Sequence, residues 1–290
     1  MNYRSARVYF ARLFILILLS LLGVTASSAE NTPRYFDPEL RISAPPLSGL
    51  PRLRFLTSLD FPPFNFADAN KRPTGMNVEL ARAICEVLNI EAKCEIQALP
   101  WSSIEAALVA KRGEAIIAGT AISNAKRDEF GLSYPYFRFP GRFLAKRGTA
   151  LGAGDTLQKR LADKSIAVVE KSAHEAMLKS YFPTVKPIPL ADAQAVYNSL
   201  QEGETEFAFV DGVSSSFWLS SPDAANCCSF VGGPYYSEKF LGLGMAVVTR
   251  SEDALLLQAI NSALKSIEES GKYQEIFERY FPNSPHGEGF

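Results

Sequence analysis

The chain has 290 residues, of which 47% are hydrophobic, with 30 Lys or Arg and 31 Asp or Glu. This length suits two domains of about 100–150 residues, each with a core of its own. The near balance of charges lacks the basic surface by which proteins bind nucleic acids and anionic membranes, so we expect neither as a partner.

The first 29 residues have the pattern of a secretory signal peptide. Arg4, Arg7 and Arg12 precede an apolar run over residues 13–24, and small residues follow over 26–29. A run of about 12 residues is shorter than the ~20 that a membrane-spanning helix needs. We therefore predict cleavage and export, with an uncleaved anchor as the alternative. Loss of the three arginines lowers the net charge from −1 to −4.

Residues 30–51 hold five prolines and little periodicity, so we interpret them as a leader or linker and not as a core element. Beyond them, Leu53–Leu56 is predicted as a strand and Asp60–Phe64 as a rigid loop. Apolar residues at helical spacing predict an amphipathic helix over Leu80–Leu88. A second strand is predicted over Cys94–Leu99.

The next predicted helix runs through Ala110 and follows Trp101. Ser102 or Ser103 would act as its N-cap, because a side-chain oxygen at that position accepts a hydrogen bond from the first turn.

Two apolar strands end near side chains of opposite charge. Ala115–Gly119 leads through a turn to Lys126 and Arg127, whereas Phe207–Val210 ends directly at Asp211. Continuous apolar strands are typical of parallel sheets, and open α/β sheets bind ligands at the carboxyl ends of their strands. A free amino acid carries one carboxylate and one ammonium, so these two strand ends predict a site for a zwitterion.

The four cysteines fit an oxidising compartment. Cys85 falls late in the first predicted helix and Cys94 in the next strand. Because a helix packs against the strand that follows it, we predict a Cys85–Cys94 disulfide, with two separate buried thiols as the alternative. For the adjacent Cys227 and Cys228, the bridged and the reduced states both stay open.

Two histidines, His174 and His286, are present, and the chain has neither a CxxC nor an HExxH motif. We therefore predict no metal site and no cofactor.

Two similar halves are visible in the chain. Residues 104–119 and 196–211 each combine a helix, a Gly-Glu turn and a buried strand, although chance likeness of common elements is the alternative. Phe137–Arg147 is predicted as the passage between two α/β lobes and Tyr235–Val248 as the return. If the closing amphipathic helices pack on the first lobe, the chain crosses twice and forms a two-strand hinge that allows closure around a ligand.

The chain from about Leu53 to Pro282 resembles family 3 of the periplasmic solute-binding proteins, the polar amino acid receptors of ABC importers. The order and spacing of several short stretches carry this resemblance: Phe61–Phe66, Gly75–Ala81, Pro100–Trp101, Ala118–Ser123, Leu132–Tyr136, Phe207–Asp211 and Ala263–Phe277. The resemblance implies two Rossmann-like α/β lobes of the type II periplasmic binding protein fold, with the ligand between them.

In that family two aromatic side chains sandwich the apolar part of the ligand, and these match Phe61 and Trp101. Ordinary core packing is the alternative for both. Gly119 would offer backbone groups at close approach, because it has no Cβ. Ala121 stands where the family usually has a hydroxyl residue, so only its backbone amide remains for the ligand.

The family's carboxylate-binding arginine matches Arg127 if the turn is adjusted by one residue, whereas strict spacing falls on Lys126. We choose Arg127, because a guanidinium fork fits a carboxylate better than an ammonium does. From the second lobe, Ser172 resembles the hydroxyl residue that contacts the ligand carboxylate at a helix start. Asp211 resembles the acid that holds the ligand ammonium, and a helix N-cap is its alternative role.

Ser58 matches a position at which receptors for basic amino acids often carry an acid, which argues mildly against Lys, Arg or ornithine as ligand. The nearby Asp60 is able to compensate.

We therefore expect a monomeric periplasmic protein that captures an amino acid and delivers it to an ABC importer permease. A cyclohexadienyl dehydratase with His174 or Glu175 as general acid and a ligand-sensing partner of a membrane receptor are the alternatives. The expected boundaries are a signal peptide at 1–29, a leader at 30–51, a first lobe at 52–138 and 241–282, a second lobe at 139–240, and a tail at 283–290.

Overall fold

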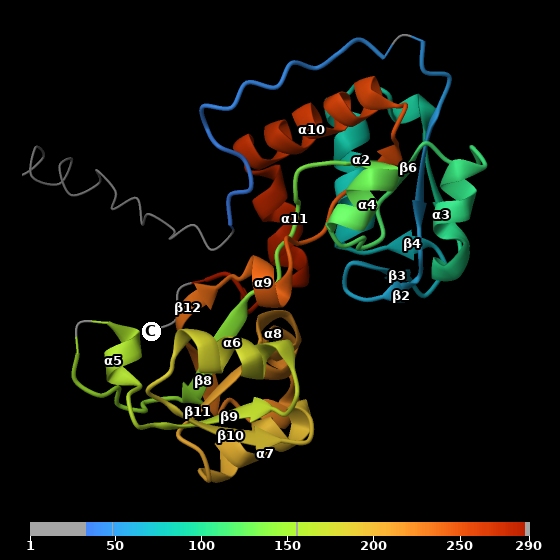
Figure 1. The fold of residues 1–290 in the computed structure, drawn as a ribbon. Helices are drawn as coiled ribbons and strands as arrows, with labels where there is room; N and C mark the ends of the chain where they lie inside the picture. The colour runs from blue at the N-terminus through green and yellow to red at the C-terminus, as the bar shows by residue number, and fades with distance from the viewer. Residues whose placement is uncertain (1–32, 48, 155, 288–290) are drawn as a thin grey trace, which may run out of the picture. The chain divides into compact units, whose positions relative to one another are not determined.

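The computed structural model describes residues 33–47, 49–154 and 156–287 (Figure 1). The predicted signal peptide lies outside these residues, as does the end of the predicted tail. The rest of the chain forms two five-stranded sheets and one small three-stranded sheet.

The first sheet has the strand order β5-β1-β6-β13-β7. Its central strand β1 (Leu53–Thr57) pairs in parallel with β5 (Cys94–Ala98) and with the short β6 (Ala115–Ile116). The returning strand β13 (Val248–Arg250) runs antiparallel between β6 and β7 (Phe130–Leu132). The sheet is therefore mixed, and the predicted strand over 115–119 leaves the ladder after Ile116.

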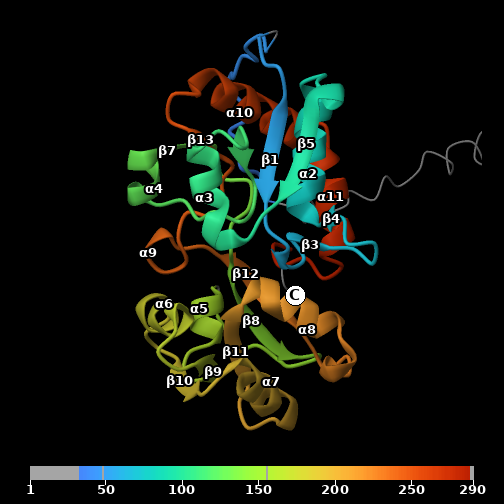
Figure 2. The ribbon, with the colours of Figure 1, turned by 90° about the vertical axis from the view of Figure 1, so that its right-hand side faces the viewer.

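Alternating side chains of β1 enter two separate cores, because successive residues of a strand point to opposite faces. Leu53 and Phe55 pack with α2 (Met76–Val87), α10 (Ala254–Glu269) and α11 (Lys272–Tyr280). Leu56 packs on the other face with α3 (Trp101–Val109), and α2 and α3 lie on either side of β1 (Figure 2).

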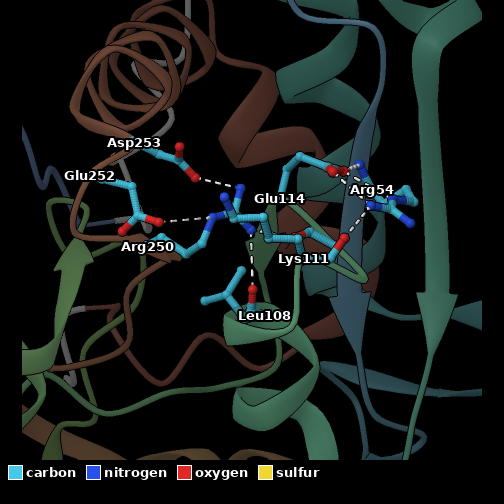
Figure 3. Close-up of polar contacts among 8 residues, drawn as sticks. Arg54, Leu108, Lys111, Glu114, Arg250, Glu252 and Asp253 are labelled. Carbon is cyan, nitrogen blue, oxygen red and sulfur yellow. Dashed lines mark hydrogen bonds and ion pairs between the residues drawn. The ribbon is translucent and has the colours of Figure 1, made fainter.

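A charged cluster ties together the end of this sheet that lies away from the carboxyl end of β1 (Figure 3). The Arg54 guanidinium forms an ion pair with Glu114 at 2.7 Å. Arg250, from β13, donates to the carbonyl oxygens of Leu108 and Gly113 and pairs with Asp253 at 2.5 Å. These contacts join β1, α3 and β13 to the residues just before β6, at the end of the sheet opposite the carboxyl end of β1.

The segment before β1 packs on the first lobe, so the expectation that it contributes nothing to the core was wrong. Phe36 is a member of the core cluster of that lobe. The amides of Tyr35 and Phe36 donate to the Glu268 carboxylate at 2.7 and 3.2 Å, and Gln258 donates to the carbonyl oxygen of Ser43. The segment thus runs along α10 in the opposite direction and is held by polar side chains of that helix (Figure 1).

The second sheet has the order β10-β9-β11-β8-β12. Strands β9 (Ser165–Val169), β10 (Lys186–Leu190) and β11 (Phe207–Asp211) are parallel. The first crossing continues into β8 (Gly141–Lys146), which is antiparallel to β11 and to β12 (Cys228–Tyr235).

Helices cover both faces of this sheet as well. Phe143 and Phe209 pack against α6 (Ala173–Tyr181) on one face. Leu144 and Ala208 pack with residues of α7 (Ala193–Glu202) and α8 (Gly212–Ser220) on the other. The remaining elements are short: β2 (Asp60–Phe61), β3 (Asn65–Ala67), β4 (Pro73–Thr74), η1 (Glu91–Lys93), α4 (Asn124–Glu129), α5 (Leu157–Arg160), η2 (Pro222–Ala224) and α9 (Glu238–Leu241).

The chain after α11 is also anchored. His286 is buried, and its ring nitrogen Nδ1 lies 2.7 Å from the Tyr236 hydroxyl. Arg142, the second residue of β8, donates to the carbonyl oxygens of Pro285 and Gly287. The described part of the predicted tail, which ends at residue 287, therefore contacts the start of β8 and the segment that returns to the first lobe.

Both cysteine pairs are bonded in the structure, and no described cysteine is free. Cys85 and Cys94 join the end of α2 to the start of β5, with 6.2 Å between their Cα atoms. The adjacent Cys227 and Cys228 are also bonded to each other. A search of the described helices finds none with the length and apolar character needed to cross a membrane.

Candidate functional site

A cavity of about 260 Å³ opens where three parallel strands of the first sheet end. Its walls come from the segments that follow the carboxyl ends of β1, β5 and β6, which is where open α/β sheets bind their ligands. The residues that line it are Ser58, Asp60, Phe61, Trp101, Ala118 and Gly119.

Phe61 and Gly119 meet in the wall of this cavity. Gly119 has a φ of +88°, a left-handed conformation that side-chain-bearing residues rarely adopt. A Cβ at this position would lie 2.6 Å from the Phe61 ring, so the close approach requires glycine. Phe64 stacks behind Phe61, with the ring centroids 4.9 Å apart, and fixes the ring that faces the cavity.

Trp101 is the first residue of α3, and the residue is 45% exposed. Helix α3 therefore begins earlier than predicted, with Pro100 as its N-cap residue, and the expectation that Ser102 or Ser103 caps it was wrong. Instead, the Ser103 hydroxyl donates to the carbonyl oxygen of Pro100. A large aromatic side chain left exposed at a strand end is available to contact a ligand.

A buried polar network supports the cavity from behind, and the sequence did not predict it. The Asn65 side-chain amide donates to the hydroxyl of Ser58 at 2.8 Å. The Asn77 amide in turn donates to Asn65 Oδ1 at 2.7 Å. Tyr136 lies beside Asn77 and the Gly119 backbone, and burial raises the pKa of its hydroxyl. The sequence signal was three polar residues next to apolar strand and helix positions, which need partners when buried.

The two candidate cations for the ligand carboxylate differ in their surroundings. Lys126 forms an ion pair with Glu105, with Nζ 2.6 Å from the carboxylate oxygen. Arg127 is exposed on the same short helix α4, and its side chain forms no hydrogen bond or ion pair with another described residue. Neither Arg127 nor the exposed Ala121 belongs to the lining of the first-lobe cavity, and both stay predictions.

In the second lobe, Ser172 follows strand β9, and Asp211 is the last residue of the neighbouring parallel strand β11. Each caps a helix: Ser172 accepts from the Glu175 amide at 3.1 Å, and Asp211 Oδ1 accepts from the Ser214 amide at 2.7 Å. The Ser172 hydroxyl also donates to the carbonyl oxygen of Val169. Its hydrogen is therefore already used, which leaves the free amides of the first turn of α6 to face an anion.

His174 lies next to this pair on the first turn of α6. Its ring is 6.0 Å from that of Phe209 on β11, and its Nε2 is buried with no hydrogen-bond partner among the described residues. Burial lowers the pKa of His174, and the nearby Asp211 carboxylate opposes this effect. Glu175 is used locally, since its carboxylate pairs with Lys179 at 2.6 Å.

A group of three or more His, Cys, Asp or Glu side chains able to hold a metal ion is absent from the described part of the chain. The groups at the site are aromatic rings, amides, the hydroxyls of Ser58 and Ser172, and single carboxylates. This set suits recognition of a small polar molecule.

Two α/β lobes, each with a mixed five-stranded sheet covered by helices and linked by two passages of the chain, define the type II periplasmic binding protein fold. Residues 53–283 match the family described as bacterial extracellular solute-binding proteins, family 3. The chain belongs to this family, as its sequence motifs predicted.

Known relatives include the lysine/arginine/ornithine-binding periplasmic protein of Escherichia coli (strain K12). It is 26% identical over 252 residues, which cover 86% of this chain and 95% of that protein.

Two solved structures align over 81% of this chain and 94% of their own length, each with a TM-score of 0.66. They are an ancestral cyclohexadienyl dehydratase, 17% identical, and the L-cystine solute receptor of Neisseria gonorrhoeae in its unliganded open conformation, 16% identical. At these identities the likeness concerns the fold alone.

Proposed function

We propose that this protein captures an amino acid, or a related zwitterion, and delivers it to an ABC importer in the membrane. The observation that carries this proposal is the grouping of Phe61, Trp101 and Gly119 around one cavity at the carboxyl ends of the first sheet. The chain belongs to a family of solute-binding proteins, and relatives are named as amino acid-binding periplasmic proteins.

The proposed roles follow from charge. Phe61 and Trp101 contact the apolar part of the ligand, and Arg127 binds its carboxylate together with the backbone at Ala121 and the first turn of α6 after Ser172. Asp211 binds the ammonium through Oδ2, because Oδ1 already accepts from Ser214. A ligand bridging both lobes would favour their closed arrangement, which a permease is able to recognise.

Isothermal titration of the purified protein against the common amino acids tests this function. Binding of at least one of them, with loss of affinity in a Trp101→Ala variant, is expected. Silence across the whole panel at millimolar concentration would overturn the proposal. Mass spectrometry of small molecules that co-purify with the native protein identifies the ligand independently.

The proposed setting is the periplasm, reached through the signal peptide over residues 1–29, and the proposed form is a monomer with no nucleic-acid partner. Mass determination of the exported chain tests the cleavage site, and light scattering tests the monomer. If the same ligand-loaded form acts on a membrane receptor instead, the cleft residues keep their roles and the partner differs.

A catalytic role is the second candidate, and one observation favours it. Beside Asp211, His174 has a buried ring nitrogen with no hydrogen-bond partner in the described part of the chain, and a structural neighbour is a cyclohexadienyl dehydratase. A buried imidazole at a binding site is able to act as a general acid. We propose that the protein is not an enzyme, and turnover of prephenate or arogenate by the purified protein would overturn this.

A further inference from the structure

The cavity of the first lobe has a single charged side chain in its lining, and that charge is negative. A second cavity of about 380 Å³ shares Ser58 and Asp60 with it and is otherwise lined by apolar residues, namely Leu59, Ala98, Leu99 and Pro100. Lys, Arg and His are absent from both sets of lining residues. Asp60 is thus the one ionisable group common to the two adjoining spaces.

The Asp60 carboxylate is available to a ligand. Its backbone is fixed in β2, where Asp60 pairs with Phe66 of β3, so the position of the side chain is set by the small three-stranded sheet. Its side chain makes no hydrogen bond or ion pair with another described residue. Asp60 is exposed, so its carboxylate is reached from solvent, and without a protein cation beside it the charge stays available to a cation that enters the cavity.

The neighbouring side chains suit the same kind of group. Phe61 and Trp101 present aromatic faces, which attract cations by their ring quadrupoles. A neutral apolar side chain in this place would desolvate the carboxylate and offer it no partner, which is unfavourable. One acid and two aromatic rings in the same lining, with no basic residue among them, make an environment that suits a guanidinium or a primary ammonium.

We propose that the side chain of the bound amino acid carries a second cation, a guanidinium or a primary ammonium, and that Asp60 selects it. This inference rests on the proposed function and adds the class of ligand. Ser58 argued mildly against a basic ligand by its position in the sequence. The structure accounts for the difference, because Asp60 lines the same cavity and supplies the acid from two residues further along the chain.

Titration with matched pairs of ligands isolates the charge of the side chain. Arginine is compared with citrulline and lysine with norleucine, because the members of each pair share the α-carboxylate and α-ammonium and have similar side-chain lengths. A hydrogen-bonded charge contributes about 1.5–3 kcal/mol. We therefore expect the charged member of at least one pair to bind about ten- to a hundredfold more tightly than its neutral partner.

Variants assign this preference to Asp60. Asp60→Asn should reduce the preference to a few-fold or less, and Asp60→Glu should retain part of it. Asp223→Asn is the matched control, because it removes the same charge from an exposed position in η2 of the second lobe and should leave the preference intact. Circular dichroism and thermal unfolding of each variant establish that it is folded.

The outcomes separate this inference from the function on which it rests. Tight binding of neutral amino acids, with no preference for the charged member of either pair, overturns the cationic ligand and leaves the proposed function standing. A preference that survives in Asp60→Asn overturns the role of Asp60. Absence of binding to every amino acid overturns both.

Discussion

Asp211 shows how one side chain can serve the fold and the ligand together. Its Oδ1 accepts a hydrogen bond from the Ser214 amide and caps α8, whereas Oδ2 has no hydrogen-bond partner among the described residues. A carboxylate has acceptor sites for both tasks. The sequence left capping and ammonium binding as alternatives for this residue, and the geometry makes them compatible.

Substitution of Asp211 should separate the two tasks. Asp211→Asn keeps the cap, because asparagine and aspartate are equally favoured there, but loses the charge. We expect stability to stay within about 0.5 kcal/mol and affinity for the ligand to fall about ten- to a hundredfold.

Asp211→Ala should lose the same affinity and, in addition, about 1 kcal/mol of stability. Urea unfolding and isothermal titration of both variants measure these effects. Unchanged affinity in Asp211→Asn would show that the carboxylate caps the helix and does not bind ligand.

Arg127 and Lys126 can be distinguished in the same way. Because Lys126 is engaged with Glu105, Lys126→Gln should change the affinity less than threefold. Arg127→Gln should weaken binding about tenfold or more, since it removes a charge-assisted contact to the carboxylate. Titration with the amino acid and with its carboxamide provides the control: the preference for the amino acid over its carboxamide should be smaller in Arg127→Gln than in the wild type. The reverse ranking of the variants would transfer the role to Lys126.

At the residue scale, the sequence predicted residues in the wall of the cavity but not the buried polar network behind it. Phe61, Trp101 and Gly119 lie in short motifs at strand ends, where position alone suggests ligand contact. The Ser58–Asn65–Asn77 network connects the loop after β1 with β3 and α2. Hydrogen bonds of this kind depend on tertiary placement, which hydrophobic periodicity does not record.

At the scale of elements, the helices and strands of the two sheets followed from periodicity, whereas the terminal segments did not. The segment before β1 and the chain after α11 have neither helix nor strand in the structure, yet both bury aromatic side chains, Phe36 and His286. An extended segment that packs against helices and strands already formed has no hydrophobic periodicity of its own. Its contacts are set by the surface beneath it, here Glu268 for one and Arg142 for the other.

His286 makes the second of these segments sensitive to acid. Burial, reinforced by the Arg142 guanidinium, lowers the pKa of its imidazole to about 3, against 6.5 ordinarily. The unfolded chain therefore binds one more proton than the folded chain between these values. Stability is fully present above pH 6.5 and falls as the pH drops toward 3, by about 1.4 kcal/mol per pH unit from this group.

Unfolding in urea between pH 7 and pH 4 measures this dependence. The free energy of unfolding should depend less steeply on pH in His286→Gln than in the wild type. The difference corresponds to the uptake of one proton, because the other titrating groups are the same in both proteins. Equal slopes would mean that His286 is already solvated in the folded protein.

The Cys85–Cys94 disulfide links α2 to β5 across a short loop, with a sequence separation of 9. Closing a loop of this size removes unfolded-state entropy worth about 2–3 kcal/mol. Replacement of both residues by alanine should lower the free energy of unfolding by that amount and leave ligand affinity unchanged. Dithiothreitol should destabilise the wild type more than the variant. If dithiothreitol destabilised the wild type and the variant equally, the loss of stability on reduction would come from the Cys227–Cys228 bond.

At the scale of the whole molecule, ligand binding should stabilise the fold because the ligand binds the folded chain alone. A ligand at one hundred times its dissociation constant contributes about 2.7 kcal/mol. For a protein of this size the thermal midpoint should rise by about 5–10 °C. Differential scanning calorimetry with and without ligand measures the shift, and Trp101→Ala should reduce it at the same ligand concentration.

The position of β13 between β6 and β7 has a consequence for the order in which the protein is built. The second sheet uses one uninterrupted stretch of chain, from Gly141 to Tyr235, whereas the first sheet has a gap until Val248–Arg250 has been synthesised. Pairings between distant residues form late, since the intervening chain must be ordered first. In a nascent chain that ends before Val248, the second lobe has all its strands, whereas the first lobe still has β6 and β7 with unpaired edges. Unpaired strand edges are the ones that promote aggregation. The half of the protein that carries the aromatic cavity is thus the first to be made and the last to be completed.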